Sequence, residues 1–283
     1  MLVDIHTHIF PPEIIRDRER FFPCEPEFRL LYDSPKAKLS SAEALIAEMD
    51  EAGVDRAVTF GFPWRNPKLH VLHNDYVLNA AAKVSSRLIA FGCTSLYGRE
   101  ALREAERCFR GGARGLGELA LYSGENLDRA AENFSDVAQI CRERRGILLV
   151  HANEPVGHVY PGKASAGLDY YYSLAKLAAG VPLVFGHWGG GLCFFELLKK
   201  EAPEVLANVY YDSAASPFLY RPEIYPVAAR AAGAGKILFG SDWPLISQKR
   251  CLKEMKDSGL SEAEFLAIAG ENAARLLGIS PTG

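Results

Sequence analysis

The sequence of 283 residues predicts a single (β/α)8 barrel, the TIM-barrel fold. Short apolar runs rich in Val, Ile, Leu and Phe alternate along the chain with segments of helical period, as in parallel strands joined by helices. Eight such runs occur, which is the number that closes a parallel sheet into a barrel. Several, such as residues 147–150, are continuously apolar, as expected for strands covered on both faces.

The expected strands are short and follow one another at regular spacing. They cover residues 2–6, 56–62, 88–94, 115–119, 147–151, 183–187, 209–212 and 237–240. An open doubly wound sheet is the rival topology. It is disfavoured because no G-x-G-x-x-G motif follows the first run.

The expected helices fill the gaps between these strands. Ser40 and Glu43 have the spacing of a capping box, which predicts a helix that runs through Met49. Ser261 and Glu264 have the same spacing at the start of residues 261–277. The other expected helices cover residues 75–85, 100–110, 127–145, 168–179, 192–200, 223–232 and 249–256.

One long segment interrupts the regular spacing. Residues 10–39 separate the first strand from its helix and are rich in proline and aromatic residues. We expect an extended loop insertion that lies over the mouth of the barrel. No linker or change of composition divides the rest of the chain, so residues 1–283 are expected to form one domain.

The composition excludes some classes of partner. Lys and Arg number 32 against 35 Asp and Glu, and this balance disfavours nucleic acid. No basic segment followed by an apolar one opens the sequence and no apolar run has the length of a membrane span, so we expect a cytoplasmic protein that binds no membrane. The six cysteines are scattered without a C-x-x-C pair, as in a reduced protein.

Polar residues gather where strands of the predicted barrel end. They are His6, His8, Glu118, His151, His187 and Asp242. Parallel barrels carry their active sites at the carboxyl ends of the strands, so these six side chains are expected to converge. His6 and His8 are two residues apart on one strand and therefore point to the same side. Both imidazoles can then bind one ion at about 2.0–2.1 Å.

The motifs around these residues resemble those of a known family. They are Val-Asp-Ile-His-Thr-His at 3–8, Val-His-Ala at 150–152, Gly-His-Trp-Gly-Gly at 186–190, Gly-Ser-Asp-Trp-Pro at 240–244 and Glu-Asn-Ala-Ala-Arg-Leu-Leu at 271–277. In this order they resemble the amidohydrolase superfamily, and in particular its amidohydrolase-related branch, which includes enzymes similar to aminocarboxymuconate semialdehyde decarboxylase. The resemblance covers nearly the whole chain.

The resemblance implies a metal site. His6, His8, His151 and Asp242 would bind the ion, while His187 would contact a bound water or the substrate, or bind a second ion. Glu118 takes the place of the carboxylate that bridges two ions in binuclear relatives; the equally weighted alternative is a glutamate that supports the metal ligands or contacts the substrate. One ion is expected and two are possible. Zn²⁺ suits this ligand set best, with Mn²⁺ or Fe²⁺ as alternatives.

Substrate contacts are expected from the loops that follow the strands. The candidates are Trp64, Arg65, Tyr122, Glu154, His158 and Trp188. An arginine suits a substrate carboxylate, and the tryptophans Trp188 and Trp243 suit an aromatic wall. His70 and His73 lie beyond the second expected strand, where a helix is expected to start, and both are predicted to be structural.

Three functions are compatible with these residues. The first expectation is hydrolysis of a small amide, ester or lactone by metal-activated water, with Asp242 carrying the proton and His187 polarising the carbonyl. The alternative is non-oxidative decarboxylation of a small unsaturated or aromatic acid. The third is a metal-binding barrel without catalysis. The expected partner is a small molecule, and a homodimer is possible.

Overall fold

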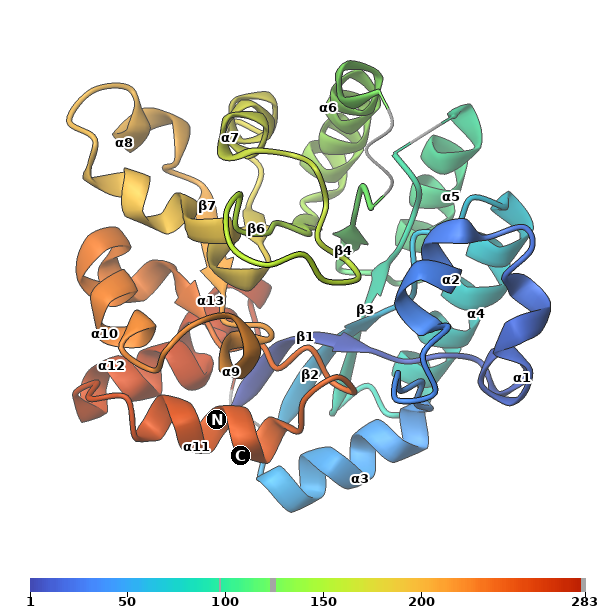
Figure 1. The fold of residues 1–283 in the computed structure, drawn as a ribbon, viewed down its shortest axis with the longest axis horizontal. Coiled ribbons are helices and arrows are strands. Elements are labelled where there is room, and N and C mark those ends of the chain that lie inside the picture. Colours follow the sequence, from blue (N-terminus) through green and yellow to red (C-terminus); the bar gives the residue numbers. More distant parts are fainter. Residues whose placement is uncertain (97, 123–125, 281–283) are drawn as a thin grey trace.

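Eight parallel strands form a barrel in the computed structural model, which describes residues 1–96, 98–122 and 126–280 (Figure 1). The strands pair in chain order, as the sequence predicts. They are β1 (Val3–His8), β2 (Arg56–Phe60), β3 (Leu88–Gly92), β4 (Gly115–Leu119), β5 (Ile147–Val150), β6 (Leu183–Phe185), β7 (Val209–Asp212) and β8 (Ile237–Leu238). The (β/α)8 fold is therefore confirmed.

The first and last strands meet through main-chain hydrogen bonds. β8 is two residues long, and the residues after it continue alongside β1. Ile5 N donates to Phe239 O at 2.9 Å, Asp242 N to His6 O at 3.0 Å and His8 N to Trp243 O at 2.8 Å. This seam brings Asp242 beside the two histidines of β1.

Helices surround the barrel (Figure 1). They are α3 (Ala42–Ala52), α4 (Pro67–Lys83), α5 (Arg99–Arg110), α6 (Leu127–Arg144), α7 (Leu168–Leu177), α8 (Ala202–Val205), α9 (Ser216–Leu219), α10 (Ile224–Ala228), α11 (Gln248–Lys256), α12 (Glu262–Leu266) and α13 (Asn272–Leu277). The predicted capping box of Ser261 and Glu264 is confirmed. The N-cap of α3 is Ser41 rather than Ser40, because the Ser41 hydroxyl accepts from Ala44 N.

The expected helix at 192–200 is replaced by an irregular segment. A 3-10 segment, η2 (His187–Leu197), begins directly after β6, and Trp188 to Gly191 have positive φ. A Cβ on Gly190 would lie 2.2 Å from Asn153 O, so only glycine fits this close approach of two loops.

The insertion after β1 is helical rather than extended. It contains α1 (Pro12–Arg16), a 3-10 turn η1 (Arg18–Phe21) and α2 (Pro26–Tyr32). Its apolar side chains, such as Phe10 and Phe28, form a separate core with Phe62 and Trp64, which follow β2. Burial of these rings offsets the loss of conformational entropy when the segment is ordered. In the folded chain, α1 and α2 lie beside α4 at one side of the barrel (Figure 1).

Apolar side chains fill the inside of the barrel below the polar residues. They include Ile5, Val58, Leu149, Val184 and Leu238, and all five are at most 1% exposed. The polar cluster therefore rests on a packed, water-excluding floor. Among the described residues, none of the helices has the length and apolar character needed to cross a membrane.

Candidate metal centre at the carboxyl ends of the strands

The six strand-end residues converge at one end of the barrel. The distances between their ligand atoms are 3.6 Å (His6 Nε2 to Glu118 Oε1), 3.7 Å (His6 Nε2 to Asp242 Oδ1), 3.3 Å (His8 Nε2 to Asp242 Oδ1), 3.4 Å (His187 Nε2 to Glu118 Oε1) and 2.8 Å (His151 Nδ1 to Glu118 Oε1). Three overlapping groups of residues each place three ligand atoms close enough to bind one ion: His6, His8 and Glu118; His6, His187 and Asp242; and Glu118, His151 and His187. The sequence prediction that these residues lie together is met.

The geometry of the cluster fits a divalent cation. Four ligand atoms arranged tetrahedrally at about 2.0–2.1 Å from an ion lie about 3.3–3.4 Å apart, close to the spacing found around His6 and His8. Nε2 of His6 is buried and has no hydrogen-bond partner among the residues that the structure describes. A buried polar atom without a partner is costly, and an ion in the cluster would satisfy it.

Hydrogen bonds on the outer nitrogens fix the orientation of three rings. Nδ1 of His6 donates to Asp212 Oδ2 at 2.8 Å, Nδ1 of His8 to Gly61 O at 3.3 Å and Nδ1 of His187 to Ala214 O at 3.0 Å. Each Nε2 is thereby directed into the cluster, the arrangement typical of metal-binding histidines.

His151 differs from the other three histidines. Its Nδ1 lies 2.8 Å from Glu118 Oε1 and its Nε2 lies 3.0 Å from Gly162 O. Both ring nitrogens are thus occupied, and a ligand role for His151 needs Nδ1 to exchange Glu118 for the ion. That role stays a prediction.

Asp212 is a member of the site that the sequence analysis did not single out. Its Oδ2 accepts from His6, and its Oδ1 accepts from the backbone N of His187 at 2.9 Å and of Ala214 at 3.0 Å. The residue is fully buried. It ends the seventh apolar run, so the positional rule that selected the other residues could have found it.

A second buried carboxylate supports the cluster from below. Asp4 accepts hydrogen bonds from Ser241 Oγ, from Gln248 Nε2 at 2.8 Å and from His6 N at 3.0 Å. Burial raises the pKa of Asp4 to about 6 even though these bonds favour the charged form. Asp4 joins β1 to the loop after β8 and so holds His6 and Asp242 in register.

The buried charges shift the pKa values of the cluster. Burial alone would lower the pKa of His6, but the surrounding carboxylates outweigh it and raise that pKa to about 10. Burial opposes ionisation of Asp242, yet its hydrogen bond with His8 and the charge of His6 lower its pKa to about 2. The pKa of Glu118 is likewise held well below its ordinary value, against burial, by neighbouring histidines. Because a metal ion needs neutral imidazoles, it must displace these protons.

His187 combines a raised pKa with an unusual backbone. Burial lowers the pKa of its ring, but the hydrogen bond with Glu118 and the charge of Asp242 outweigh burial and raise it. His187 and Asp242 have φ values of 55° and 66°. Left-handed conformations are uncommon for residues other than glycine, and those that occur cluster at functional sites.

A cavity of about 590 Å³ lies above the cluster. Its lining includes the aromatic side chains of Tyr32, Phe62, Tyr122 and Phe218. The rings of Phe62 and Tyr122 are nearly parallel, with an interplanar angle of 11° and centroids 6.0 Å apart. Flat apolar walls of this kind suit an unsaturated ring better than a flexible polar chain.

The structure separates the predicted substrate contacts. Tyr122 and His158 line the cavity, and the Tyr122 hydroxyl donates to Glu118 Oε2 at 3.3 Å. The other four candidates are not among the described residues that line it. Trp64 donates to His73 Nδ1, Arg65 pairs with Glu27, Glu154 accepts from Tyr160 and Lys163, and Trp188 donates to Ser216 Oγ. Substrate contact by these four remains a prediction.

Three solved structures share this fold over almost the whole chain. The 5-carboxyvanillate decarboxylase LigW from Sphingomonas paucimobilis is 17% identical, with a TM-score of 0.77 over 99% of both chains. A dihydroxybenzoic acid decarboxylase from Polaromonas sp. JS666, with bound manganese and the inhibitor 2-nitroresorcinol, is 18% identical, with a TM-score of 0.70 over 98% of this chain and 96% of that one. IDCase from Metarhizium anisopliae, in apo form, is 19% identical, with a TM-score of 0.74 over 98% and 97%.

The first expectation, a hydrolase of small amides, esters or lactones, is contradicted by this comparison. Two of the neighbours are named for the removal of a carboxyl group from an aromatic acid. The same histidines and carboxylates can serve either reaction, so the ligand set in the sequence could not separate them.

Sequence comparison places the chain in a family. The comparison with curated protein sequences gives no match. A family model described as amidohydrolase matches residues 3–279, nearly the full length. The chain therefore belongs to the amidohydrolase family and is an enzyme of that superfamily.

Proposed function

We propose that this protein is a metal-dependent, non-oxidative decarboxylase of a small aromatic or unsaturated acid. The observation that carries the proposal is a cluster that fits a divalent cation at the base of a cavity with aromatic side chains in its walls, with His187, whose pKa is raised, among the lining residues. The decarboxylases that share the fold support the same reaction.

His6, His8 and Asp242 would hold the ion, together with Glu118 or His151. When bound, a divalent cation supplies positive charge that binds an anionic group of the substrate and stabilises charge that develops on it. Imidazole nitrogens suit Zn²⁺ and carboxylate oxygens suit Mn²⁺. The manganese in the Polaromonas relative makes Mn²⁺ the ion to test beside Zn²⁺.

His187 is the proposed proton donor. Its Nδ1 donates to Ala214 O, so a proton for the reaction would come from Nε2, which lies 3.4 Å from Glu118 Oε1 on the floor of the cavity. When the bond between the ring carbon and the carboxylate breaks, the electron pair stays on that carbon and takes the proton from Nε2. CO2 leaves, and the imidazole regains a proton from solvent.

The test is decarboxylation of hydroxylated and carboxylated benzoic acids by protein loaded with Mn²⁺ or Zn²⁺. We expect release of CO2 in an amount equal to the acid consumed and, in D2O, one deuterium on the vacated carbon. His187→Gln should lower kcat by about 10²–10⁴-fold, the usual contribution of a general acid. Lys253→Gln, an exposed change on α11, is the matched control.

Two results would contradict the proposal. One is consumption of the acids without CO2. The other is a metal-loaded protein that turns over no acid of the panel.

A further inference from the structure

The mouth of the cavity carries a charge opposite to that of the carboxylates on its floor. Lys36 and Lys38 line the cavity and are exposed. They come from residues 33–41, which join α2 to α3. Of the described residues that line the cavity, Glu118 and Asp242 on the floor are the only acidic ones. An anion that enters the cavity therefore meets two ammonium groups without a competing carboxylate at the rim.

Arg18 fixes the backbone of the segment that carries these lysines. Its Nη1 donates to Ala37 O at 2.8 Å and its Nη2 donates to Ser34 O at 3.1 Å. Ala37 N donates to Ser34 O at 3.0 Å and closes a turn. Lys36 and Lys38 thus flank a residue whose position is set by an arginine within the same insertion. The lysines are held at the rim by a formed turn.

The two ammonium groups are available to a ligand. Neither Lys36 nor Lys38 forms an ion pair within the part of the chain that the structure describes, whereas Lys163, in the loop after β5, and Lys236, directly before β8, are both paired with glutamates. A lysine left without a carboxylate at the rim of a ligand cavity attracts anions from solution.

We propose that Lys36 and Lys38 form an anion subsite at the cavity mouth, and that the substrate is a dianionic acid. Its reacting carboxylate would lie at the metal cluster, its unsaturated framework between the aromatic walls, and its second anionic group, such as another carboxylate, at the lysines. The inference rests on the proposed function for the identity of the reacting group. It adds the requirement that the substrate carry a second negative charge.

Binding of simple carboxylates tests this subsite without turnover. The probes are benzoate, isophthalate and terephthalate, titrated calorimetrically into Mn²⁺-loaded protein. We expect at least one of the two dicarboxylates to bind about tenfold more tightly than benzoate, as two exposed ion pairs allow. In the double variant Lys36→Gln/Lys38→Gln this preference should vanish while benzoate affinity is unchanged. High salt should reduce the preference of the unchanged protein.

Two further variants separate charge from structure. Lys36→Arg/Lys38→Arg should retain the preference for a dicarboxylate, because both charges are kept. Lys249→Gln/Lys253→Gln removes two exposed lysines of α11, away from the cavity, and should leave all three affinities unchanged. The subsite is refuted if no dicarboxylate is preferred, or if the glutamine variant at 36 and 38 keeps the preference.

The subsite and the decarboxylation can fail independently. CO2 release from monoanionic and dianionic acids with equal KM, unaffected by Lys36→Gln/Lys38→Gln, would leave the reaction standing and remove the subsite. Absence of CO2 release together with a lysine-dependent preference for a dicarboxylate would support the subsite and contradict the proposed decarboxylation.

Discussion

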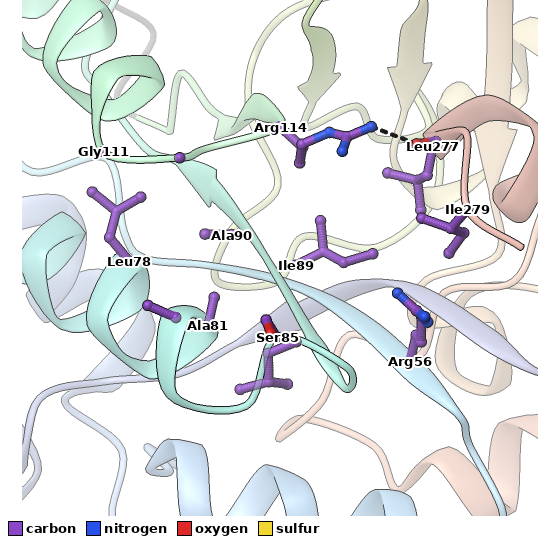
Figure 2. Close-up of a pocket in the computed structure, with 13 residues that line it drawn as sticks. Arg56, Leu78, Ala81, Ser85, Ile89, Ala90, Gly111, Arg114, Leu277 and Ile279 are labelled. Carbon is purple, nitrogen blue, oxygen red and sulfur yellow. Dashed lines mark hydrogen bonds between the residues drawn. The ribbon is translucent and has the colours of Figure 1, made fainter. Parts of the chain in front are cut away.

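The two ends of the barrel each carry a cavity, and the two cavities differ in their linings. The cavity at the carboxyl ends of the strands, about 590 Å³, has four histidines and two carboxylates among its lining residues. The cavity at the amino ends, about 250 Å³, is mostly apolar, with Arg56 and Arg114 as its charged residues among those described (Figure 2). Arg114 is directed at Leu277 and donates to its carbonyl oxygen at 2.7 Å.

This difference indicates that the cavity at the amino ends is a gap in the packing, whereas the cavity at the carboxyl ends is a functional site. At the amino end, Arg114 binds the chain itself, and no carboxylate or imidazole faces it across the cavity in the described part of the chain. At the carboxyl end, ionisable groups converge and shift one another's pKa values, while His6 Nε2 is buried with no hydrogen-bond partner in the described part of the chain. Convergent groups with perturbed pKa values mark a functional site more reliably than cavity size does.

The largest effect is expected for Asp242→Asn. The change keeps the shape of the side chain but removes a charge that lies 3.3 Å from His8 Nε2 and 3.7 Å from His6 Nε2. We expect metal affinity to fall by more than about 100-fold, beyond the usual effect of an outer hydrogen-bond partner, and decarboxylation to fall with it. Metal analysis after dialysis against a graded chelator measures the affinity. Full metal occupancy in this variant would show that Asp242 is not a ligand of the ion.

Asp212→Asn should have the next largest effect. Asp212 does not face the cavity, but it orients His6 through Nδ1 and holds the backbone of His187. We expect metal affinity to fall about 10–100-fold, as is usual for the partner of a metal-binding histidine. Competition with a chromophoric chelator gives the value. A change of less than twofold would mean that the orientation of His6 does not depend on this carboxylate.

His73 allows buried histidines inside and outside the site to be compared. Its Nδ1 accepts from Trp64 Nε1 at 3.0 Å and its Nε2 donates to Ile9 O at 2.6 Å, so the folded ring is neutral. Burial lowers its pKa to about 3. The unfolded chain binds this proton below about pH 6.5 and the folded chain does not, so stability is lost as the pH falls from 6.5 toward 3.

The loss attributable to His73 is about 2 kcal/mol at pH 5. Urea unfolding at pH 7 and pH 5 should therefore show a smaller fall in stability for His73→Gln than for the unchanged protein. Taking the difference between the two proteins cancels Asp4, whose raised pKa of about 6 acts in the opposite direction. Equal slopes with pH for both proteins would contradict a neutral buried ring.

The smallest effect is expected at the amino end of the barrel. Arg114→Gln removes the bond to Leu277 O and should cost about 0.5–1.5 kcal/mol in unfolding free energy. Metal affinity and CO2 release should not change. Thermal unfolding and chelator competition on the same sample check both statements. A loss of activity without a loss of stability would show that the amino end takes part in function.

The sequence was most informative where position along a strand determines where a side chain points. Strand ends meet at one rim in a parallel barrel, so His6, Glu118 and Asp242 could be assigned to one site without coordinates. Asp212 obeys the same rule, but its neighbours gave no motif that drew attention to it.

Features set by contacts between distant segments could not be predicted. The insertion is helical because Phe28 packs on Phe62 and Trp64, residues that follow another strand. Trp64 therefore lies in this core, where it donates to His73, although its position after a strand suggested a substrate contact. The reaction could not be chosen either, since it depends on the cavity walls, which come from loops and not from the strand pattern.

The seam between β1 and β8 links ion binding to the fluctuations of the barrel. The amides of His8 and Asp242 donate across this seam, and the side chains of the same two residues belong to the metal cluster. A local opening that exposes these amides to hydrogen exchange would also separate the ion's ligands. Ion release and seam opening would then be the same event, and an ion bound there would join the first and last strands of the chain.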